Sequence, residues 1–458
     1  MSTIRSSLAR ALLAPALGAT LLSMTPAAHS ALDATPPTRL DADLRCLLGV
    51  YSLTAGAAFD SATITGLDGQ PRGLRYTLSD GRFGDLKQAA NGSFVGGPAA
   101  IRFDSCAAGG LTMTFHRALV TGRRLPLPEK STRFSSDGVD LHGKLVLPAA
   151  GDAQALAVWV EGSNNNPASD DSVWPYELAR RGVAVFVYDK RGTGASGGEQ
   201  SSDFHARARD TAAAVQAAQR LAPGIRRVGV VGGSQGGWVA PLVGTLLPLD
   251  FVVMAFALAD GPVAQDKAIV ADQLRDAGFG EEAQRDAREL TLLTERIVRS
   301  SRFEGLEALD AFKASRAAAP WLAAIEPRSY TGLLLKVPSE QIRAAGPAMA
   351  QGLSFGYEPR PVIEAIAQRQ LWLLGGRDRQ APNASTQAIL RQLQQRGRPI
   401  AVAMFPHAGH GLIEPVPGPD GPVPGFAAGV FDLTAGWILQ GKPPAAGEFL
   451  IVESADAR

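Results

Sequence analysis

The amino-acid sequence predicts a doubly wound, mostly parallel α/β sheet that follows a small β-rich domain. Two observations carry this prediction. After residue 150, continuous apolar segments that suit strands buried on both faces alternate with helical segments. Before residue 125, short apolar segments alternate with Gly, Asn and Asp turn signals about every ten residues, which is typical of antiparallel strands.

The pattern divides the 458 residues into four consecutive parts and one insertion. The parts are a signal peptide (1–30), a small β-rich domain (31–127), the main α/β domain (128–445) and a C-terminal tail (446–458). The insertion (261–360) has helical periodicity with Pro and Gly breaks. Ligands bind at the carboxyl ends of the strands in open α/β sheets, so we expect this insertion to form a helical lid there.

The first 30 residues have the features of an export signal. Arg5 and Arg10 make the start positive, residues 11–22 are apolar, and the last three residues (AHS) place small side chains before a cleavage point. The apolar stretch is too short to span a membrane. We therefore expect an exported protein, periplasmic or secreted, that keeps no stable membrane anchor after cleavage.

Cys46 and Cys106 are the only cysteines, and both lie in the β-rich domain. Export makes a disulfide chemically possible, so we expect these two residues to pair. The alternative is two separate buried thiols. Two cysteines also exclude a disulfide-dense scaffold and a cysteine-rich zinc site.

The main domain opens on a predicted hairpin that turns at Ser136-Asp137-Gly138. Buried strands then alternate with helices, as a doubly wound sheet requires. Strands are predicted over residues 156–162, 183–189, 226–233, 251–260, 369–378 and 399–406, and helices over 170–181 and 203–221.

The strand over residues 226–233 runs into Gly232-Gly233-Ser234-Gln235-Gly236, a G-x-S-x-G motif with a helix-compatible segment after it. In this context the sharp turn exposes a serine hydroxyl at a helix N-terminus, where partial positive charge and free N–H groups favour an oxyanion. Ser234 is therefore the predicted nucleophile. The non-catalytic alternative is a glycine-rich turn in a binding protein.

A serine nucleophile needs a base and an orienting acid. Enzymes whose serine lies on such a strand-to-helix turn, the nucleophile elbow, carry the three residues in the chain order Ser, acid, His. His407 and His410 both follow Ser234, and we favour His410 because its loop can reach back over the sheet. For the acid we favour Asp378 over Asp260, because Asp378 lies one strand before the histidine loop.

The oxyanion formed in such a reaction requires two backbone N–H donors. The residue after the nucleophile, Gln235, supplies one of them. We expect Ser163, in the loop after the strand over residues 156–162, to supply the other.

Five separated blocks of the main domain resemble the α/β-hydrolase superfamily, especially secreted bacterial serine esterases related to prolyl-oligopeptidase-type catalytic domains. The blocks are FSSDGVDLHGKLVLP, VYDKRGTGASGG, VGVVGGSQGGWVAP, LWLLGGRDRQAP and MFPHAGHGL, and they span roughly two thirds of the chain. The resemblance implies the same assignments: Ser234, Asp378 and His410 match the triad, and Ser163 and Gln235 match the oxyanion positions. It implies no cofactor.

The resemblance has departures as well as matches. Asp189 resembles a structural aspartate rather than a catalytic acid. Glu161 stands where relatives carry a histidine, which puts an ionisable group near the acyl pocket. Gly233 stands where relatives often carry a larger residue, so we expect extra room beside the nucleophile. The N-terminal domain is too short for the propeller of many prolyl-oligopeptidase relatives.

These observations predict a serine hydrolase that cleaves carboxylic esters through an acyl-enzyme. Two alternatives stay open: an aminopeptidase or amidase with the same triad, and a non-catalytic protein that binds a glycan or lipid. With 45 basic and 44 acidic residues, the chain lacks the positive charge that nucleic-acid binding requires. We expect a small ester or short peptide as the partner, and no metal. Oligomeric state stays open.

Overall fold

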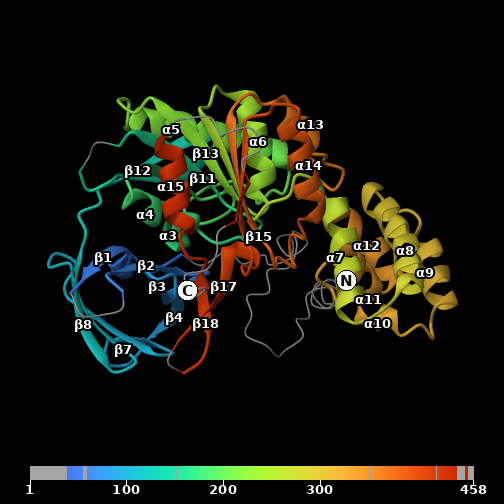
Figure 1. Ribbon diagram of the computed structural model, residues 1–458, viewed down its shortest axis with the longest axis horizontal. Coiled ribbons are helices and arrows are strands. Elements are labelled where there is room, and N and C mark those ends of the chain that lie inside the picture. The colour runs from blue at the N-terminus through green and yellow to red at the C-terminus, as the bar shows by residue number, and fades with distance from the viewer. Residues whose placement is uncertain are drawn as a thin grey trace.

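Three parts make up the structure: a closed antiparallel barrel, a nine-stranded sheet, and helices inserted between two strands of that sheet (Figure 1). The computed structural model describes residues 39–54, 59–150, 153–349, 352–418, 420–440 and 449–451. The predicted signal peptide, residues 1–30, lies outside this part of the chain. Within it, no helix is both long enough and apolar enough to cross a membrane.

Eight antiparallel strands form the N-terminal barrel, and each strand pairs with the next along the chain. The last strand then returns to the first, with Tyr51 opposite Arg124 and Leu53 opposite Gly122, which closes the ring. The strands are β1 (Gly49–Leu53), β2 (Ser61–Leu67), β3 (Gln70–Leu78), β4 (Phe83–Gln88), β5 (Phe94–Gly96), β6 (Ala99–Phe103), β7 (Gly110–Phe115) and β8 (Ala118–Arg124). The predicted β-rich domain is therefore a barrel with no free edge.

Large side chains fill the barrel, as is usual when eight strands close. The most deeply buried include Ile64, Tyr76, Leu86, Ile101 and Met113. This core continues into the main domain, because Val146, Tyr176 and Ala179 belong to the same cluster of buried residues. The barrel and the main domain thus share hydrophobic packing.

Cys46 and Cys106 form a disulfide, as the sequence predicts. Cys46 directly follows the short helix α2 (Ala42–Arg45), and Cys106 lies between β6 and β7. The bond joins the segment before β1 to the loop between β6 and β7, across 60 residues of sequence.

The main sheet has the strand order β19-β16-β15-β14-β13-β11-β12-β10-β9. Only β10 runs against its neighbours, and all other adjacent pairs are parallel. The strands are β9 (Glu129–Ser136), β10 (Val139–Val146), β11 (Ala155–Val160), β12 (Val183–Tyr188), β13 (Arg227–Gly233), β14 (Phe251–Ala255), β15 (Arg369–Gly375), β16 (Ile400–Phe405) and β19 (Phe449–Ile451). The mostly parallel sheet agrees with the prediction. The ninth strand falls within the predicted C-terminal tail, so these three residues belong to the sheet instead.

The prediction of one continuous helix over residues 170–181 is wrong. The structure has two short helices there, α3 (Ala168–Asp171) and α4 (Trp174–Ala179). Ser172 has extended backbone angles and ends the first helix. Pro175 lies in the first turn of the second, where its missing N–H costs nothing, whereas inside one continuous helix it would break a hydrogen bond.

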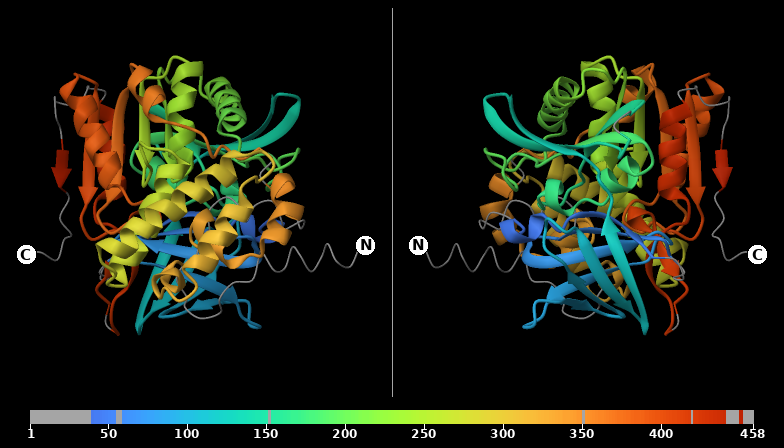
Figure 2. Two further views of the ribbon diagram at one scale, coloured as in Figure 1. Left: turned by 90° about the vertical axis from the view of Figure 1, so that its right-hand side faces the viewer. Right: turned by 90° about the vertical axis from the view of Figure 1, so that its left-hand side faces the viewer.

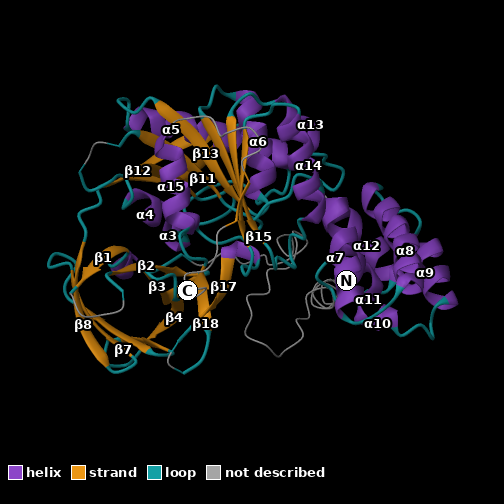
Figure 3. Cartoon of the chain, in the orientation of Figure 1, coloured by secondary structure: helices purple, strands orange, loops and turns teal. Residues whose placement is uncertain are grey.

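Helices cover both faces of the sheet (Figure 3). Alternate residues of a strand point to opposite faces, and β11 follows this rule. Leu156 and Val158 join the core beneath α5 (Phe204–Leu221), α6 (Gly236–Leu246) and α14 (Ala384–Gln395). Ala157 and Trp159 join the core beneath α4 and α15 (Val430–Gln440). Burial on both faces explains why the strand sequences are continuously apolar.

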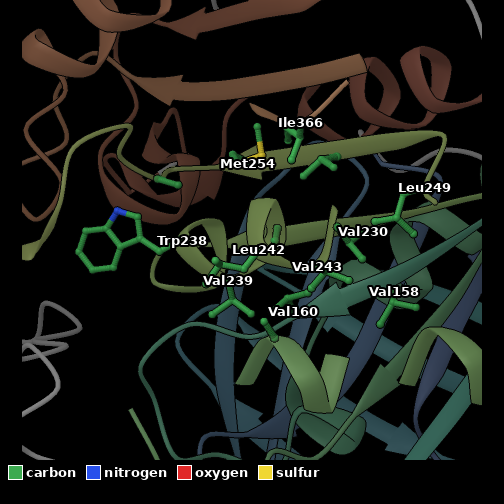
Figure 4. Close-up of a cluster of buried hydrophobic side chains, with 14 of the residues drawn as sticks. Val158, Val160, Val230, Trp238, Val239, Leu242, Val243, Leu249, Met254 and Ile366 are labelled. Atoms are coloured by element: carbon green, nitrogen blue, oxygen red, sulfur yellow. The ribbon is translucent and has the colours of Figure 1, made fainter. Parts of the chain in front are cut away.

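Helix α6 packs its apolar face on the sheet directly after the motif turn (Figure 4). Trp238, Val239, Leu242 and Val243 of the helix belong to one cluster with Val158, Val160, Val230 and Met254 of the strands. This packing holds the start of α6 close to the carboxyl ends of β11 and β13.

The helical insertion lies between β14 and β15 in the sequence, and its helices pack together beside the sheet (Figure 2). It has a hydrophobic core of its own. Its helices are α7 (Pro262–Asp276), α8 (Glu281–Arg299), α9 (Leu306–Ser315), α10 (Trp321–Ala324), α11 (Tyr330–Lys336) and α12 (Ser339–Met349), and α13 (Arg360–Ala365) leads back to the sheet. Asp272 and Asp276 of α7 pair with Arg379, which follows β15. The insertion therefore adjoins the carboxyl end of β15.

Candidate active site

Ser234 occupies a strained turn between β13 and α6. Its φ of +53° lies in the left-handed region, which residues other than glycine rarely adopt. Glycines make this turn possible: a Cβ on Gly232 would lie 2.3 Å from the Gly236 carbonyl oxygen, and one on Gly236 would lie 2.1 Å from that of Val160. The Ser234 N–H donates to the Ala255 carbonyl at 2.9 Å, and the residue stays partly exposed. The strained backbone thus presents the hydroxyl at the edge of the sheet.

His410 lies beside this hydroxyl, with its Nε2 2.9 Å from Ser234 Oγ. It begins a single helical turn, η2 (His410–Leu412), in the loop after β16. The ring of Phe256 contacts the imidazole edge to face, with 5.2 Å between ring centroids. His407 is exposed on the same loop. The structure therefore places His410, and not its rival, next to the serine.

Asp378 completes the chain of contacts. Its Oδ2 lies 2.9 Å from His410 Nδ1, and its Oδ1 accepts hydrogen bonds from the Gln380 and Ala381 N–H groups at 2.9 and 2.7 Å. The side chain is 1% exposed, so water cannot replace these partners. Asp260 instead accepts from Thr386 Oγ1 at 3.1 Å. Of the two candidate acids, the structure brings Asp378 to the histidine.

The loop after β11 passes close to the nucleophile. A Cβ on Gly162 would lie 3.3 Å from Ser234 Cβ. The Gly162 N–H is occupied by the Glu161 carboxylate at 3.3 Å. Within the described residues, by contrast, the N–H groups of Ser163 and Gln235 have no acceptor. Both predicted oxyanion donors are therefore available at the loop and at the start of α6.

Glu161 is bound within its own loop. Its carboxylate accepts from the Trp159 indole N–H at 2.8 Å, from Asn164 Nδ2 at 3.0 Å and from the Gly162 N–H. The expected ionisable group near the acyl pocket is thus held by three donors, which makes it part of the loop structure.

Gly233 does not leave extra room beside the nucleophile, contrary to the expectation from sequence. A Cβ there would lie 2.8 Å from Phe256 Cζ and 2.9 Å from Trp159 Cη2. These two rings fill the space that a side chain would occupy, so the glycine accommodates aromatic packing.

Asp189 has the structural role that the resemblance implies. It is fully buried and accepts hydrogen bonds from the N–H groups of Ser169 and Ala195 at 3.0 and 2.9 Å. His142 Nδ1 lies 3.4 Å from the same carboxylate. Burial acts to raise the pKa of Asp189, but the hydrogen bonds from His142, Ala195 and Ser169 together hold it below its usual value.

The barrel contacts both loops of the site. Asn166, in the loop after β11, donates to Asp68 of the β2–β3 turn at 3.0 Å. The segment after His410 forms the hairpin β17 (Ile413–Val416) and β18 (Val423–Phe426), and the Phe426 N–H donates to the Gly81 carbonyl at 2.9 Å. The N-terminal barrel is thus part of the frame around the serine and histidine.

Sequence reasoning missed two cations beneath the loop after β11. Lys190 follows β12 and Arg207 lies on α5, and both donate to backbone carbonyls of that loop. Their only local signals are a charged loop and an Ala- and Arg-rich helix, which are also typical of solvated surfaces. Among the described residues, no group of three or more metal-ligating side chains occurs.

A family model described as "Alpha/beta hydrolase family" matches residues 141–419, which is more than half of the chain. The chain belongs to the alpha/beta hydrolase family. It is therefore a hydrolase. The match begins within β10, so the barrel lies outside it.

Solved structures with a similar fold include esterases and peptidases. The Pyrococcus furiosus esterase Pf2001 is 16% identical with a TM-score of 0.38, over 62% of this chain and 84% of its own. The Pyrococcus horikoshii acylaminoacyl peptidase is 14% identical with a TM-score of 0.38, over 74% and 51%. The Porphyromonas gingivalis dipeptidyl peptidase 4 is 15% identical with a TM-score of 0.39, over 84% and 50%. Curated proteins contain no significant match.

Proposed function

We propose that this hydrolase cleaves carboxylic esters through an acyl-enzyme intermediate on Ser234. The observation that carries the proposal is the continuous chain of contacts from Ser234 Oγ to His410 and on to Asp378, with 2.9 Å at each step. A nucleophile within hydrogen-bond reach of a base, and a base oriented by a third group, is the signature of an activated serine.

In the proposed reaction, Ser234 Oγ attacks the acyl carbonyl while His410 Nε2 takes the hydroxyl proton. The Ser163 and Gln235 N–H groups bind the resulting oxyanion. His410 then donates its proton to the departing alcohol, which leaves the acyl group on Ser234. Water attacks this ester with His410 as base, and His410 then returns the proton to Ser234 Oγ as the acid product leaves. Asp378 holds the imidazole in one orientation and stabilises its protonated form.

The charges around the loop after β11 favour a substrate with an uncharged acyl group over a substrate with a free amino terminus. An aminopeptidase needs a free carboxylate for the substrate ammonium. Asp68, which contacts this loop, is already paired with Arg75 at 3.4 Å and with Asn166 at 3.0 Å. The Asp171 carboxylate accepts from the Gly69 N–H at 3.3 Å. Amide cleavage by the same groups is the second candidate.

Fluorophosphonate labelling tests the nucleophile. The purified protein should label, and Ser234→Ala should not. Ser201→Ala, which changes a serine away from the elbow, is the matched control and should label like the wild type. If the wild-type protein does not react with the fluorophosphonate, the catalytic proposal is wrong.

A substrate panel tests the reaction class. We expect p-nitrophenyl esters to be hydrolysed with higher kcat/KM than aminoacyl p-nitroanilides. If the anilides react faster, the amidase alternative replaces the ester proposal.

We further propose that the protein is exported before it acts. The basic and apolar start of the sequence supports this, and so does the Cys46–Cys106 disulfide, since such bonds persist in oxidising compartments. Cell fractionation and sequencing of the mature N-terminus test the proposal. Ala31 should be the first residue, and a full-length protein in the cytosol would contradict it.

A further inference from the structure

Two side chains that take no direct part in the proposed chemistry bind the backbone carbonyls of the oxyanion loop, residues 161–166. Lys190 Nζ donates to the Gly162 carbonyl at 2.8 Å and also to the Asn164 carbonyl. Arg207 Nη2 donates to the same Gly162 carbonyl at 3.2 Å and to the Glu161 carbonyl. Three carbonyls of one short loop are thus bound by two cationic side chains.

The shared acceptor belongs to the peptide group that carries the Ser163 N–H. In a trans peptide the C=O of one residue and the N–H of the next lie in one plane and point in opposite directions. Lys190 and Arg207, by fixing the Gly162 carbonyl, therefore also fix the direction of the Ser163 N–H. Donation to the carbonyl also polarises the peptide, which strengthens its N–H as a donor.

Arg207 reaches the second oxyanion position as well. Its Nη1 donates to Oε1 of Gln235, the residue whose N–H follows the nucleophile. One planar guanidinium therefore connects the loop after β11 to the start of α6. Arginine suits this role because its donors form a rigid fork, whereas the ammonium of lysine is a single point.

The position of the two side chains carries an energetic cost. Arg207 is 2% exposed, and neither cation pairs with a carboxylate within the part of the chain that the structure describes. Burial and the neighbouring charge of Arg207 lower the pKa of Lys190, and burial lowers the pKa of Arg207. A buried cation without a carboxylate partner is expensive, so stability alone does not account for this arrangement.

We propose that Lys190 and Arg207 are positioning residues for the oxyanion hole, which set the direction of the Ser163 N–H and hold it in register with the Gln235 N–H. This inference rests on the proposed serine-hydrolase function. Both side chains bind carbonyls of the loop, so we expect them to act on the transition state through it.

Kinetics of Lys190→Met and Arg207→Met test the proposal. Because the loss of one oxyanion donor costs about 100-fold or more, we expect kcat for a p-nitrophenyl ester to fall about 100-fold while KM changes little. The inhibition constant of a boronic acid, which forms a tetrahedral adduct on serine, should rise by a similar factor. Arg207→Lys should retain more activity than Arg207→Met, because it keeps one donor.

Lys144→Met is the matched control. Lys144 is also a buried lysine, but it donates to Tyr176 at 2.9 Å beside the barrel. This variant should lose thermal stability without loss of kcat. Should Lys190→Met fail to fold by circular dichroism, Arg207→Lys carries the test.

Three outcomes would overturn the inference. Folded variants with wild-type kcat and unchanged boronate inhibition would refute it and leave the proposed function intact, as would a change confined to KM. A wild-type protein that neither hydrolyses esters nor binds the boronate would refute both proposals together.

Discussion

Asn166 donates a 3.0 Å hydrogen bond to Asp68, which joins the oxyanion loop of the hydrolase domain to a turn of the N-terminal barrel. The two residues are 98 positions apart in the sequence. The barrel therefore takes part in shaping the loop that carries the Ser163 N–H, although it lies outside the family match.

The first prediction concerns this contact. Asp68→Ala should lower kcat for ester hydrolysis about tenfold, because small displacements of a positioned donor are costly in catalysis. Asp85→Ala is the matched control, since Asp85 also pairs with Arg75 but is not bonded to the oxyanion loop. The loop contact is irrelevant to catalysis if the two variants have the same kcat.

The second prediction concerns the orienting acid. Asp378→Asn should reduce kcat about 10⁴-fold, because an amide at this position favours the wrong imidazole tautomer. Circular dichroism should show an intact fold. Asp260→Asn should retain kcat within a few-fold, since Asp260 bonds to Thr386 instead of His410. A large loss in Asp260→Asn with an active Asp378→Asn would reverse the assignment of the acid.

The third prediction concerns the pH dependence of stability. Burial, and then the nearby charge of Asp68, raises the pKa of Asp171 from 3.8 to about 8. The folded protein therefore binds a proton here that the unfolded chain releases above about pH 4. Folding stability should accordingly fall between about pH 4 and pH 8, by about 1.4 kcal/mol for each unit of pKa difference.

Chemical denaturation of wild type and Asp171→Asn at pH 4 and pH 9 measures this effect. The variant should match the wild type at pH 4 and exceed it by several kcal/mol at pH 9, because it keeps an acceptor for the Gly69 N–H without the charge. Asp140→Asn is the control, because Asp140 is an exposed aspartate paired with Arg133. Its stability relative to the wild type should not change between pH 4 and pH 9. A constant difference between Asp171→Asn and wild type at both pH values would contradict the prediction.

The fourth prediction concerns the disulfide. The Cys46→Ser, Cys106→Ser double variant should be about 2–4 kcal/mol less stable than the oxidised wild type, because a bond across 60 residues restricts the unfolded chain. Thermal unfolding with and without reductant measures the loss. Reductant should destabilise the wild type and leave the double variant unchanged. Equal melting temperatures for the oxidised wild type and the double variant would count against the prediction.

The sequence predicts the parts of the structure that depend on local pattern. Ser234, Asp378 and His410 each follow a continuous apolar strand, and parallel strands bring their carboxyl ends to one edge of a sheet. The contacts among these three residues follow from that geometry. The disulfide is similar, because two cysteines in one small domain leave few alternatives.

The parts that escape prediction depend on contacts between distant segments. The pairing of β1 with β8 closes the barrel, yet no local signal marks it. Arg207 resembles a surface arginine until the fold places the Gly162 carbonyl against it. The expectation of free space at Gly233 failed for the same reason, since rings from β11 and from the segment after β14 fill it.

The helical insertion begins and ends at one narrow neck. A Cβ on Gly261, where the chain leaves the main domain, would lie 2.0 Å from the carbonyl oxygen of Tyr357, where it returns. Segments with adjacent ends are readily exchanged between proteins, because the host needs no rearrangement to accept them. The insertion has its own core, and the proposed reacting groups all come from loops outside it. Another segment can therefore take the place of this insertion without changing the residues that carry out the proposed reaction.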